Sequence, residues 1–316
     1  MTHQRLRKYL LYLLPFLFLL LILLFPSQAR NGASSGLLLW FNVLLPTLLP
    51  FMILSDFIRR LHIIESLCKR ITSRTGKNLY FLYPLLLGLL CGLPLGAKLT
   101  AEAVRSGQLT KKQGQFLLTV CNNASSMFLI GYVAESQLQH PELGGYFLVL
   151  PPVSSVLAAL LTVTLPTAMK KHSHKHISSR AQLRMTSFHD SNTDSASFTT
   201  SISTSIMDSF SILTRVGGYV ILFSILAEFL LLVDTPAVLP LVAAMEMTSG
   251  VRAICASGLS MHSKIFLSVA SVSFTGLSGI AQTADVFSGT DLSLTNYILS
   301  RLLSSLIAVL LFLVLL

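Results

Sequence analysis

Long apolar runs separated by short polar segments dominate the chain. The runs cover residues 9–26, 37–58, 79–95, 115–134, 146–168, 210–233, 237–260, 264–287 and 292–316. Most of them reach the roughly 20 residues that an α-helix needs to cross a hydrocarbon core of about 30 Å. The pattern therefore predicts an all-α polytopic membrane protein.

Some of these runs are interrupted by residues that break or polarise a helix. The run at 79–95 contains several prolines and glycines and continues into residues 97–114, which are too polar to face lipid. The run at 115–134 has Asn and Ser at its centre, and the run at 237–260 contains Glu246. Non-helical backbone at membrane depth is tolerated only inside protein or beside a water-filled cavity. We therefore expect about seven full spans plus two re-entrant helical hairpins, one in each half of the chain.

The two halves of the chain resemble each other in three places that follow the same order. The matching pairs are residues 51–57 with 223–229, 94–98 with 248–252, and 118–123 with 267–272. The first pair places Asp56 and Glu228 at the same position, and the second pair has a Gly-x-cation turn in each half. These matches favour an internal repeat, and chance agreement among apolar segments is the alternative.

The distribution of basic residues predicts the orientation in the membrane. If each hairpin enters and leaves on one side, seventeen basic groups face that side, in residues 5–8, 59–77, 105–112 and 170–184. Arg30 and Lys264 then fall on the opposite side. Because basic loops stay cytoplasmic, the N-terminus is expected in the cytoplasm. The second repeat is then inverted relative to the first, which is typical of transporters with broken helices.

Composition and charge exclude several classes of protein. The chain is 53% hydrophobic and only 11% charged, which rules out a soluble enzyme, a disordered chain and a disulfide-rich module. A net charge of +10 would suggest nucleic acid as the partner of a soluble protein, but here it marks loops at a membrane. The lipid bilayer is thus the expected partner, with no nucleic acid. The four cysteines lack metal-site spacing and no catalytic motif occurs, so we expect no enzyme, cofactor or metal.

Four parts of the chain are expected. They are an N-terminal anchor helix and loop (1–36), a first repeat (37–169), a flexible basic cytoplasmic loop (170–208) and a second repeat (209–316). A signal peptide is the alternative for residues 9–26, but that run is longer than the usual apolar region of about 7–15 residues. Residues 59–78 have the pattern of an interfacial amphipathic helix, and a solvated loop is the alternative.

Three motifs carry a resemblance to a known family. Residues 88–98 (GLLCGLPLGAK) resemble the first-half signature of the YlbJ family of sporulation integral membrane proteins. Residues 246–250 (EMTSG) look like its second-half counterpart, and 273–282 (SFTGLSGIAQ) are similar to its later Gly/Ser motif. The likeness covers about residues 37–290. That family belongs to the nucleoside-recognition, or Gate, domain group, whose fold is similar to the core of concentrative nucleoside transporters.

The resemblance implies two Gate-like repeats with paired re-entrant hairpins, at residues 37–169 and 209–316. It also implies a location in the cell membrane of a spore-forming, Gram-positive bacterium and a role in sporulation. It supplies no substrate.

The two hairpin tips are candidate ligand-binding edges. Backbone groups at a broken helix end have no partner within their helix, and a helix N-terminus favours anions and carbonyl oxygens. Polar side chains in the middle of the next span can orient a polar solute, and close helix packing with interhelical hydrogen bonds is the structural alternative. The candidate residues are Gly92, Pro94, Gly96, Asn122, Asn123, Ser125, Glu246, Thr248, Ser249, Gly250, Ser273 and Thr275.

Glu246 carries the sharpest signal among these residues. An acid deep in an apolar segment is costly, and it usually faces a cavity or a partner. We expect its carboxylate to share a polar cavity with Asn122, Asn123 and Ser273. An ion pair with Arg252 is the structural alternative.

The remaining polar groups are given structural roles. Asp56 and Glu228 lie near span ends and are expected at the membrane interface, and Glu102 is expected to pair with Lys98 one turn earlier. The histidines of residues 172–176 are expected in a solvated loop, with metal binding as the alternative.

Two functions from different classes are compatible with these features. The first is a secondary transporter or permease of a small polar, nucleoside-like solute, for which a coupling cation is a second candidate ligand and a homo-oligomer a candidate assembly. The alternative is a non-transporting membrane scaffold for spore coat or cortex formation.

Overall fold

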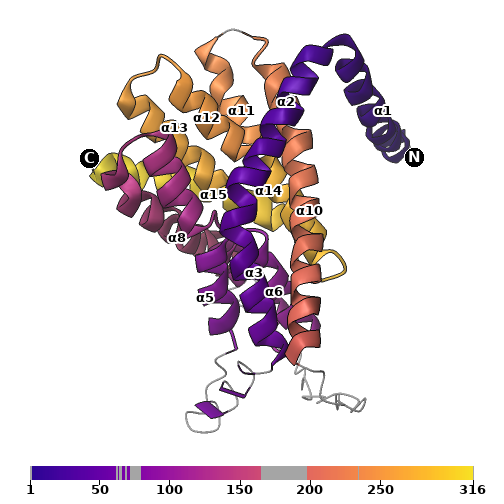
Figure 1. Ribbon diagram of the computed structural model, residues 1–316, viewed down its shortest axis with the longest axis vertical. Coiled ribbons are helices and arrows are strands. Elements are labelled where there is room, and N and C mark those ends of the chain that lie inside the picture. The colour runs from indigo at the N-terminus through magenta and orange to yellow at the C-terminus, as the bar shows by residue number, and fades with distance from the viewer. Residues whose placement is uncertain are drawn as a thin grey trace.

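The computed structural model describes residues 2–61, 80–164, 198–233 and 235–315, with residues 63, 66, 67, 70 and 71 in addition; side chains are described from residue 13 onward. All regular elements in these ranges are helical, which confirms the predicted class (Figure 1). The first half contains α1 (Thr2–Leu24), α2 (Pro26–Leu39), η1 (Trp40–Leu44), α3 (Leu45–Arg60), α5 (Leu82–Cys91), α6 (Leu95–Arg105), α7 (Lys111–Cys121), η2 (Phe128–Gln137), η3 (Pro141–Leu143), α8 (Gly144–Ala159) and η4 (Leu160–Thr164). The second half contains α10 (Phe198–Leu230), η5 (Pro236–Val238), α11 (Leu239–Met245), α12 (Met247–Ala256), α13 (Met261–Phe274), α14 (Gly276–Phe287) and α15 (Leu294–Leu315).

Five helical segments of the described chain are long and apolar enough to cross a membrane. They are Pro26–Arg60, Pro141–Thr164, Phe198–Leu230, Met261–Phe287 and Leu294–Leu315. Each of them contains most or all of a predicted span. The other two predicted spans correspond to α1 and to the broken segment formed by α7 and η2. The chain therefore has the architecture of a polytopic membrane protein.

Two segments expected as loops are helical instead. Residues 27–36 belong to α2, because Pro26 occupies the first turn, where its missing N–H costs nothing. The small residues that looked like a loop let α2 pack directly on α10. A Cβ at Gly32 would lie 2.7 Å from Ile225 Cα. Residues 198–208, expected in the basic loop, form the start of α10. Most of 59–78 and all of 170–197 lie outside the described residues, and so do the histidines at 172–176.

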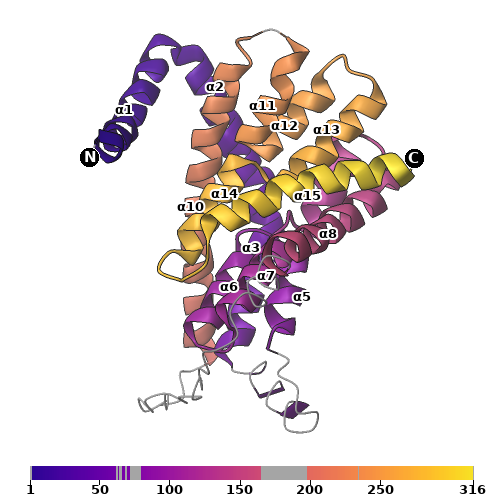
Figure 2. The same ribbon diagram turned by 180° about the vertical axis from the view of Figure 1, so that it is seen from behind.

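The order of elements in the first half is repeated in the second. A long helix (α3 or α10) is followed by two short helices packed on each other, α5 with α6 and α11 with α12. A broken helix then follows, α7 with η2 or α13 with α14, and another helix completes each set, α8 or α15. The two short hairpins lie at opposite ends, with α5 and α6 in the lower half of the view and α11 and α12 in the upper half (Figures 1 and 2).

The last helix has a polar face and an apolar face, as expected of a membrane-spanning element packed in a bundle. One face of α15 is buried and carries polar side chains, among them Ser300, Arg301 and Ser304. Its opposite face exposes leucines at helical spacing: Leu299, Leu302, Leu306, Leu310 and Leu313. Because lipid is as apolar as leucine, this arrangement places hydrogen-bonding groups inside the bundle and hydrocarbon outside.

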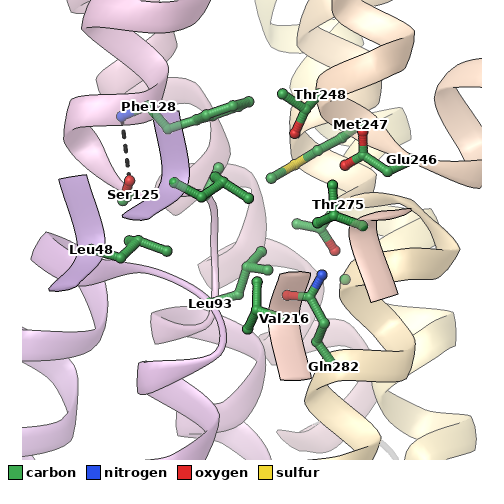
Figure 3. Close-up of a pocket in the computed structure, with 14 residues that line it drawn as sticks. Leu48, Leu93, Ser125, Phe128, Val216, Glu246, Met247, Thr248, Thr275 and Gln282 are labelled. Carbon is green, nitrogen blue, oxygen red and sulfur yellow. Dashed lines mark hydrogen bonds between the residues drawn. The ribbon is translucent and has the colours of Figure 1, made fainter. Parts of the chain in front are cut away.

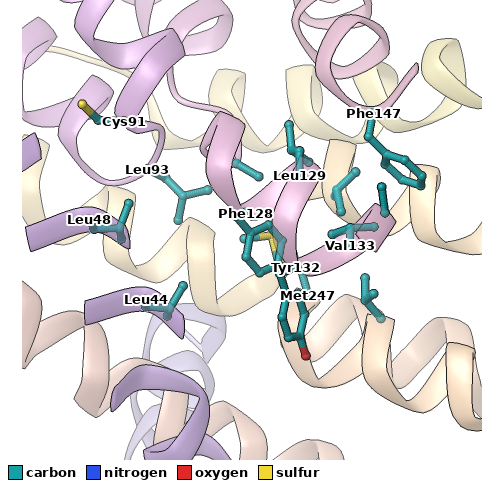
Figure 4. Packing of buried hydrophobic residues seen from close by; sticks show 14 of the residues in the cluster. Leu44, Leu48, Cys91, Leu93, Phe128, Leu129, Tyr132, Val133, Phe147 and Met247 are labelled. Atoms are coloured by element: carbon teal, nitrogen blue, oxygen red, sulfur yellow. The ribbon is translucent and has the colours of Figure 1, made fainter. Parts of the chain in front are cut away.

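An apolar cluster fills the space between the two hairpins (Figure 4). Leu93 at the tip of the first hairpin and Met247 at the tip of the second belong to it. Phe128 and Tyr132 of η2 stack with ring centroids 5.0 Å apart and complete its centre. The core thus holds the two tips and the broken helix in one packed unit.

Candidate functional site

A small cavity lies where the two hairpin tips and both broken helices meet (Figure 3). Its polar lining consists of Ser125, Glu246, Thr248, Thr275 and Gln282. Apolar side chains from α3, the first tip, η2 and α10 line the rest, including Leu48, Leu93, Phe128 and Val216. The space that a water-sized sphere can occupy is about 20 Å³, which is enough for a single water molecule. Four of the twelve candidate residues therefore share one cavity: Ser125, Glu246, Thr248 and Thr275.

Glycines fix the first tip against the break after α7. Gly92 has φ +72°, and a Cβ at this position would lie 2.5 Å from Ser125 N. A Cβ at Gly96 would clash with the Cys121 carbonyl oxygen. The Leu93 N–H donates to Asn123 O at 2.7 Å, and the Leu93–Pro94 peptide is cis. Gly92 and Gly96 thus allow the first tip, which includes Pro94, to pack closely against the break after α7.

Glu246 forms the second tip and begins α12. Its backbone is extended, and its Oε2 accepts a hydrogen bond from the Ser249 N–H at 2.6 Å, as an N-cap side chain does. The Ser249 hydroxyl lies 2.9 Å from that of Ser224 on α10, which ties the tip to the long helix. A Cβ at Gly250 would overlap Ala243, so glycine permits the close crossing of α11 and α12. Among the described residues no ion pair joins Glu246 to Arg252.

The break between α13 and α14 completes the cavity. Thr275 has φ +71°, which is strained for a β-branched residue, and Gly276 follows with φ +68°. A Cβ at Gly276 would lie 3.1 Å from Met247 N, so the break fits closely under the second tip. The strained residue therefore stands at the point where the chain faces Glu246.

Two buried polar atoms at the cavity lack partners in the described part of the chain. They are Thr248 Oγ1 and Gln282 Oε1, while the Gln282 amide nitrogen donates to Ser278 Oγ at 3.1 Å. The Gln282 oxygen and the Glu246 carboxylate accept hydrogen bonds, whereas the Thr248 hydroxyl can both accept and donate. The cavity is therefore suited to a group that donates hydrogen bonds or carries positive charge.

Asn122, Asn123 and Ser273 do not share this cavity with Glu246, contrary to the expectation from the sequence. Asn122 Oδ1 accepts from the Ala97 N–H of the first hairpin at 3.1 Å, and its amide nitrogen donates to Thr283 and Tyr297, each at 2.8 Å. The reason is the geometry of the break: the side chains of Asn122 and Asn123 face α14 and α15, while the next residues, Ala124 and Ser125, face the cavity.

Arg301 is the most buried cation of the described chain, and the sequence analysis did not identify it as a candidate residue. It lies two turns from the start of α15 with 0% exposure. Its guanidinium donates to Asn123 Oδ1 at 2.7 Å, to Ser155 Oγ at 2.9 Å, to Ser273 O at 3.4 Å and to Thr119 O. The available signal was a single charge inside an otherwise apolar span, which in membrane proteins marks a functional or paired group.

A second charged cluster lies at the end of α3. Asp56, expected at the interface, is only 4% exposed and pairs with Arg59 at 2.6 Å, Arg60 at 2.7 Å and Lys98 at 3.6 Å. Glu102 pairs with Arg59 at 3.7 Å, and no pair with Lys98 is found in the described residues. The expected Glu102–Lys98 pair is not formed because the first hairpin brings Lys98 against α3, where Lys98 and two arginines surround the Asp56 carboxylate. Glu228, at the matching position in the second half, is half-buried.

No group of three or more His, Cys, Asp or Glu side chains within the described ranges is placed to hold a metal ion. The buried polar residues described above are mostly hydroxyls and amides, which form hydrogen bonds without carrying charge. The three described cysteines are unpaired, with Cys91 and Cys121 buried.

A comparison with known proteins shows that the chain is similar to an integral membrane protein of sporulation. The chain is 26% identical to the sporulation integral membrane protein YlbJ of Bacillus subtilis strain 168 over an alignment of 329 positions. The alignment covers 93% of this chain and 79% of that protein. No protein-family profile matches the chain, and no solved structure matches it.

Proposed function

We propose that the chain is a member of the YlbJ family, since its similarity to that protein extends over nearly its whole length, and that it is a secondary transporter or permease for a small polar solute in sporulation. The observation that carries the proposal is Glu246, a buried acid at one hairpin tip that faces a cavity bounded by the other tip and has no ion-pair partner among the described residues. An acid in an apolar segment is retained at a cost, and it usually serves a polar pathway.

The repeated order of elements supports this proposal. The two hairpins lie at opposite ends and each is followed by a broken helix, and in this proposal they are inverted-topology repeats whose tips meet at the binding site. The strained Thr275 and the glycine-shaped first tip stand at that meeting point. This is the arrangement expected of a site that is reached alternately from either side of the membrane.

The chemistry of the lining favours a neutral or cationic solute that donates hydrogen bonds, as the hydroxyl and amino groups of a nucleoside do. Glu246, Thr248 and Gln282 present acceptor oxygens to the cavity, and Leu93, Phe128 and Met247 offer apolar surface for a flat ring. The space of about 20 Å³ holds only a water molecule, so binding of such a solute requires the tips to separate. The structure thus corresponds to a closed form in this proposal.

A scaffold that does not transport is the second candidate. It is favoured by the small size of the cavity and by the N-cap that Glu246 forms with Ser249, which gives the acid a structural task without any solute.

Uptake by the purified full chain in proteoliposomes separates the two functions. A panel of radiolabelled nucleosides and nucleobases is compared in vesicles with the wild-type chain, the Glu246→Gln variant and no protein. Uptake by the wild type that is lost in Glu246→Gln supports transport. The scaffold is supported if the wild type matches empty vesicles for every solute while it still restores sporulation to a deletion strain.

A further inference from the structure

Arg301 lies at a junction of four helical elements without an acidic partner. It is fully buried on α15, and its hydrogen-bond acceptors come from α7, the residues after α7, α8 and α13. All four acceptors are neutral: an amide oxygen, a hydroxyl and two backbone carbonyls. The Tyr297 ring adds a cation–π contact, with the ring centroid 5.5 Å from the guanidinium carbon. In the described part of the chain no carboxylate pairs with this cation.

Two of the four acceptors are backbone carbonyls near helix ends, and their positions indicate the role of the Arg301 cation. Thr119 O lies in the last turn of α7, and Ser273 O lies in the last turn of α13. The last four carbonyls of a helix have no amide partner within it, and the C-terminal end carries negative partial charge. Both helices end inside the bundle, where no bulk water can satisfy those groups. Two negative helix ends therefore converge on one positive side chain.

The acceptors around Arg301 are also those that bind metal cations in membrane proteins. Broken helices commonly coordinate Na⁺ through unwound backbone carbonyls and half-helix C-terminal ends. Here the guanidinium occupies that position and makes four hydrogen bonds with the same kinds of oxygen. Its Nε has no hydrogen-bond partner in the described structure, so the group is held by the acceptors of its two terminal nitrogens.

We propose that Arg301 is a fixed internal cation that takes the place of a bound metal ion at the ends of α7 and α13. It assembles both breaks permanently and so positions the cavity wall, because Ser125 and Thr275 lie only two residues beyond its partners Asn123 and Ser273. If the protein transports, movement of solute is then not coupled to Na⁺ or K⁺ at this junction. This consequence rests on the proposed function, but the role of Arg301 in the fold does not, and it is tested without transport.

Thermal unfolding of the purified full chain in detergent tests the role of Arg301. The Glu246→Gln variant is expected to have the same Tm in sodium, potassium and choline chloride. Arg301→Ala leaves two helix ends and two side chains without their cation, so its Tm should fall by ~5 °C or more. Millimolar guanidinium or methylguanidinium should restore part of that loss. Arg215→Ala is the matched control, since Arg215 is 54% exposed and pairs with Asp285. The Arg215→Ala protein should neither lose stability nor respond to guanidinium.

Three results would overturn the inference. Stabilisation of the Glu246→Gln variant, which lacks the cavity acid, by Na⁺ or K⁺ relative to choline would show that a metal ion still binds at the junction. Failure of every added cation to stabilise a folded Arg301→Ala protein would contradict a role for the charge. If Arg301→Ala does not fold, Arg301→Lys and Arg301→Met decide: the charged variant should be the more stable of the two, and the reverse order contradicts the proposal.

Discussion

The Arg301 guanidinium donates a hydrogen bond to Asn123 Oδ1 at 2.7 Å, across 178 positions of sequence. The bond joins the last helix to the break after α7, and the Ser155 hydroxyl of α8 donates to the same oxygen at 2.8 Å. One amide therefore connects three elements from both halves of the chain. The cavity wall at Ser125 begins two residues later.

Removal of that amide is expected to destabilise the protein. Asn123→Ala takes away an acceptor of a fully buried cation, and its own hydrogen bond to Val120 O, so the free energy of unfolding should fall by about 1–3 kcal/mol. Thermal unfolding in detergent measures this change. Asn42→Ala, on the exposed face of η1, is the control and should leave the Tm unchanged. Equal loss in both variants would contradict the assigned role of Asn123.

Replacement of the Glu246 carboxylate by an amide should separate folding from function. Glu246→Gln keeps an oxygen that accepts from the Ser249 N–H, so the Tm and the amount of protein in the membrane should remain close to the wild type. Spore yield should nevertheless drop to that of a deletion strain, because the negative charge at the cavity is lost. Glu228→Gln, a half-buried acid in the same half of the chain, should retain wild-type yield. Normal sporulation of Glu246→Gln at equal protein level would refute a functional carboxylate.

The glycine at the start of α6 should be irreplaceable on steric grounds. Gly96→Ala places a methyl group against the Cys121 carbonyl, which is rigid backbone, and a loss of about 1–3 kcal/mol is expected. Gly218→Ala is the matched control: it is exposed on α10 with nothing within 4 Å of the added Cβ, and there alanine should be neutral or stabilise by up to ~1 kcal/mol. Tm values of the two variants that do not differ would show that the tip is not packed as described.

The first hairpin should enter and leave on the cytoplasmic side. Gln108 lies in the turn between α6 and α7, and Ser260 lies between α12 and α13 at the opposite end of the molecule (Figure 2). With the native cysteines replaced, Ser260→Cys in intact cells should react with a membrane-impermeant maleimide, whereas Gln108→Cys should react only after the cells are opened. The reverse labelling pattern would contradict the orientation predicted from the basic residues.

The breaks in the helices could be read from the sequence because they depend on local chemistry. Gly92 and Pro94 lie between α5 and α6, and Glu246 lies between α11 and α12, so residues singled out from the sequence stand at both tips. The polar run at 27–36 was misread because its small residues serve tight packing on α10, a property of the partner helix that no local pattern records.

The partners of the polar side chains could not be predicted for the same reason. Asp56 obtains Lys98 only when the first hairpin folds against α3, and Arg301 obtains Thr119 and Ser273 only when both broken helices meet α15. Sequence spacing identified the second tip and several cavity residues, including Ser125 and Thr275. It could not tell that Asn122 and Asn123 face the other way, because a break frees the backbone from helical periodicity.

Accessibility of the cavity tests the central claim most directly, because it needs no knowledge of the solute. Thr248→Cys is placed in a background without the native cysteines, and reaction with a membrane-impermeant maleimide is followed in vesicles from each side. A site that opens between the hairpin tips predicts slow labelling of Thr248→Cys from at least one side, while Ala308→Cys, buried on α15 away from the cavity, stays unlabelled. Thr248→Cys that remains as unreactive as Ala308→Cys from both sides would contradict a solute pathway through this cavity.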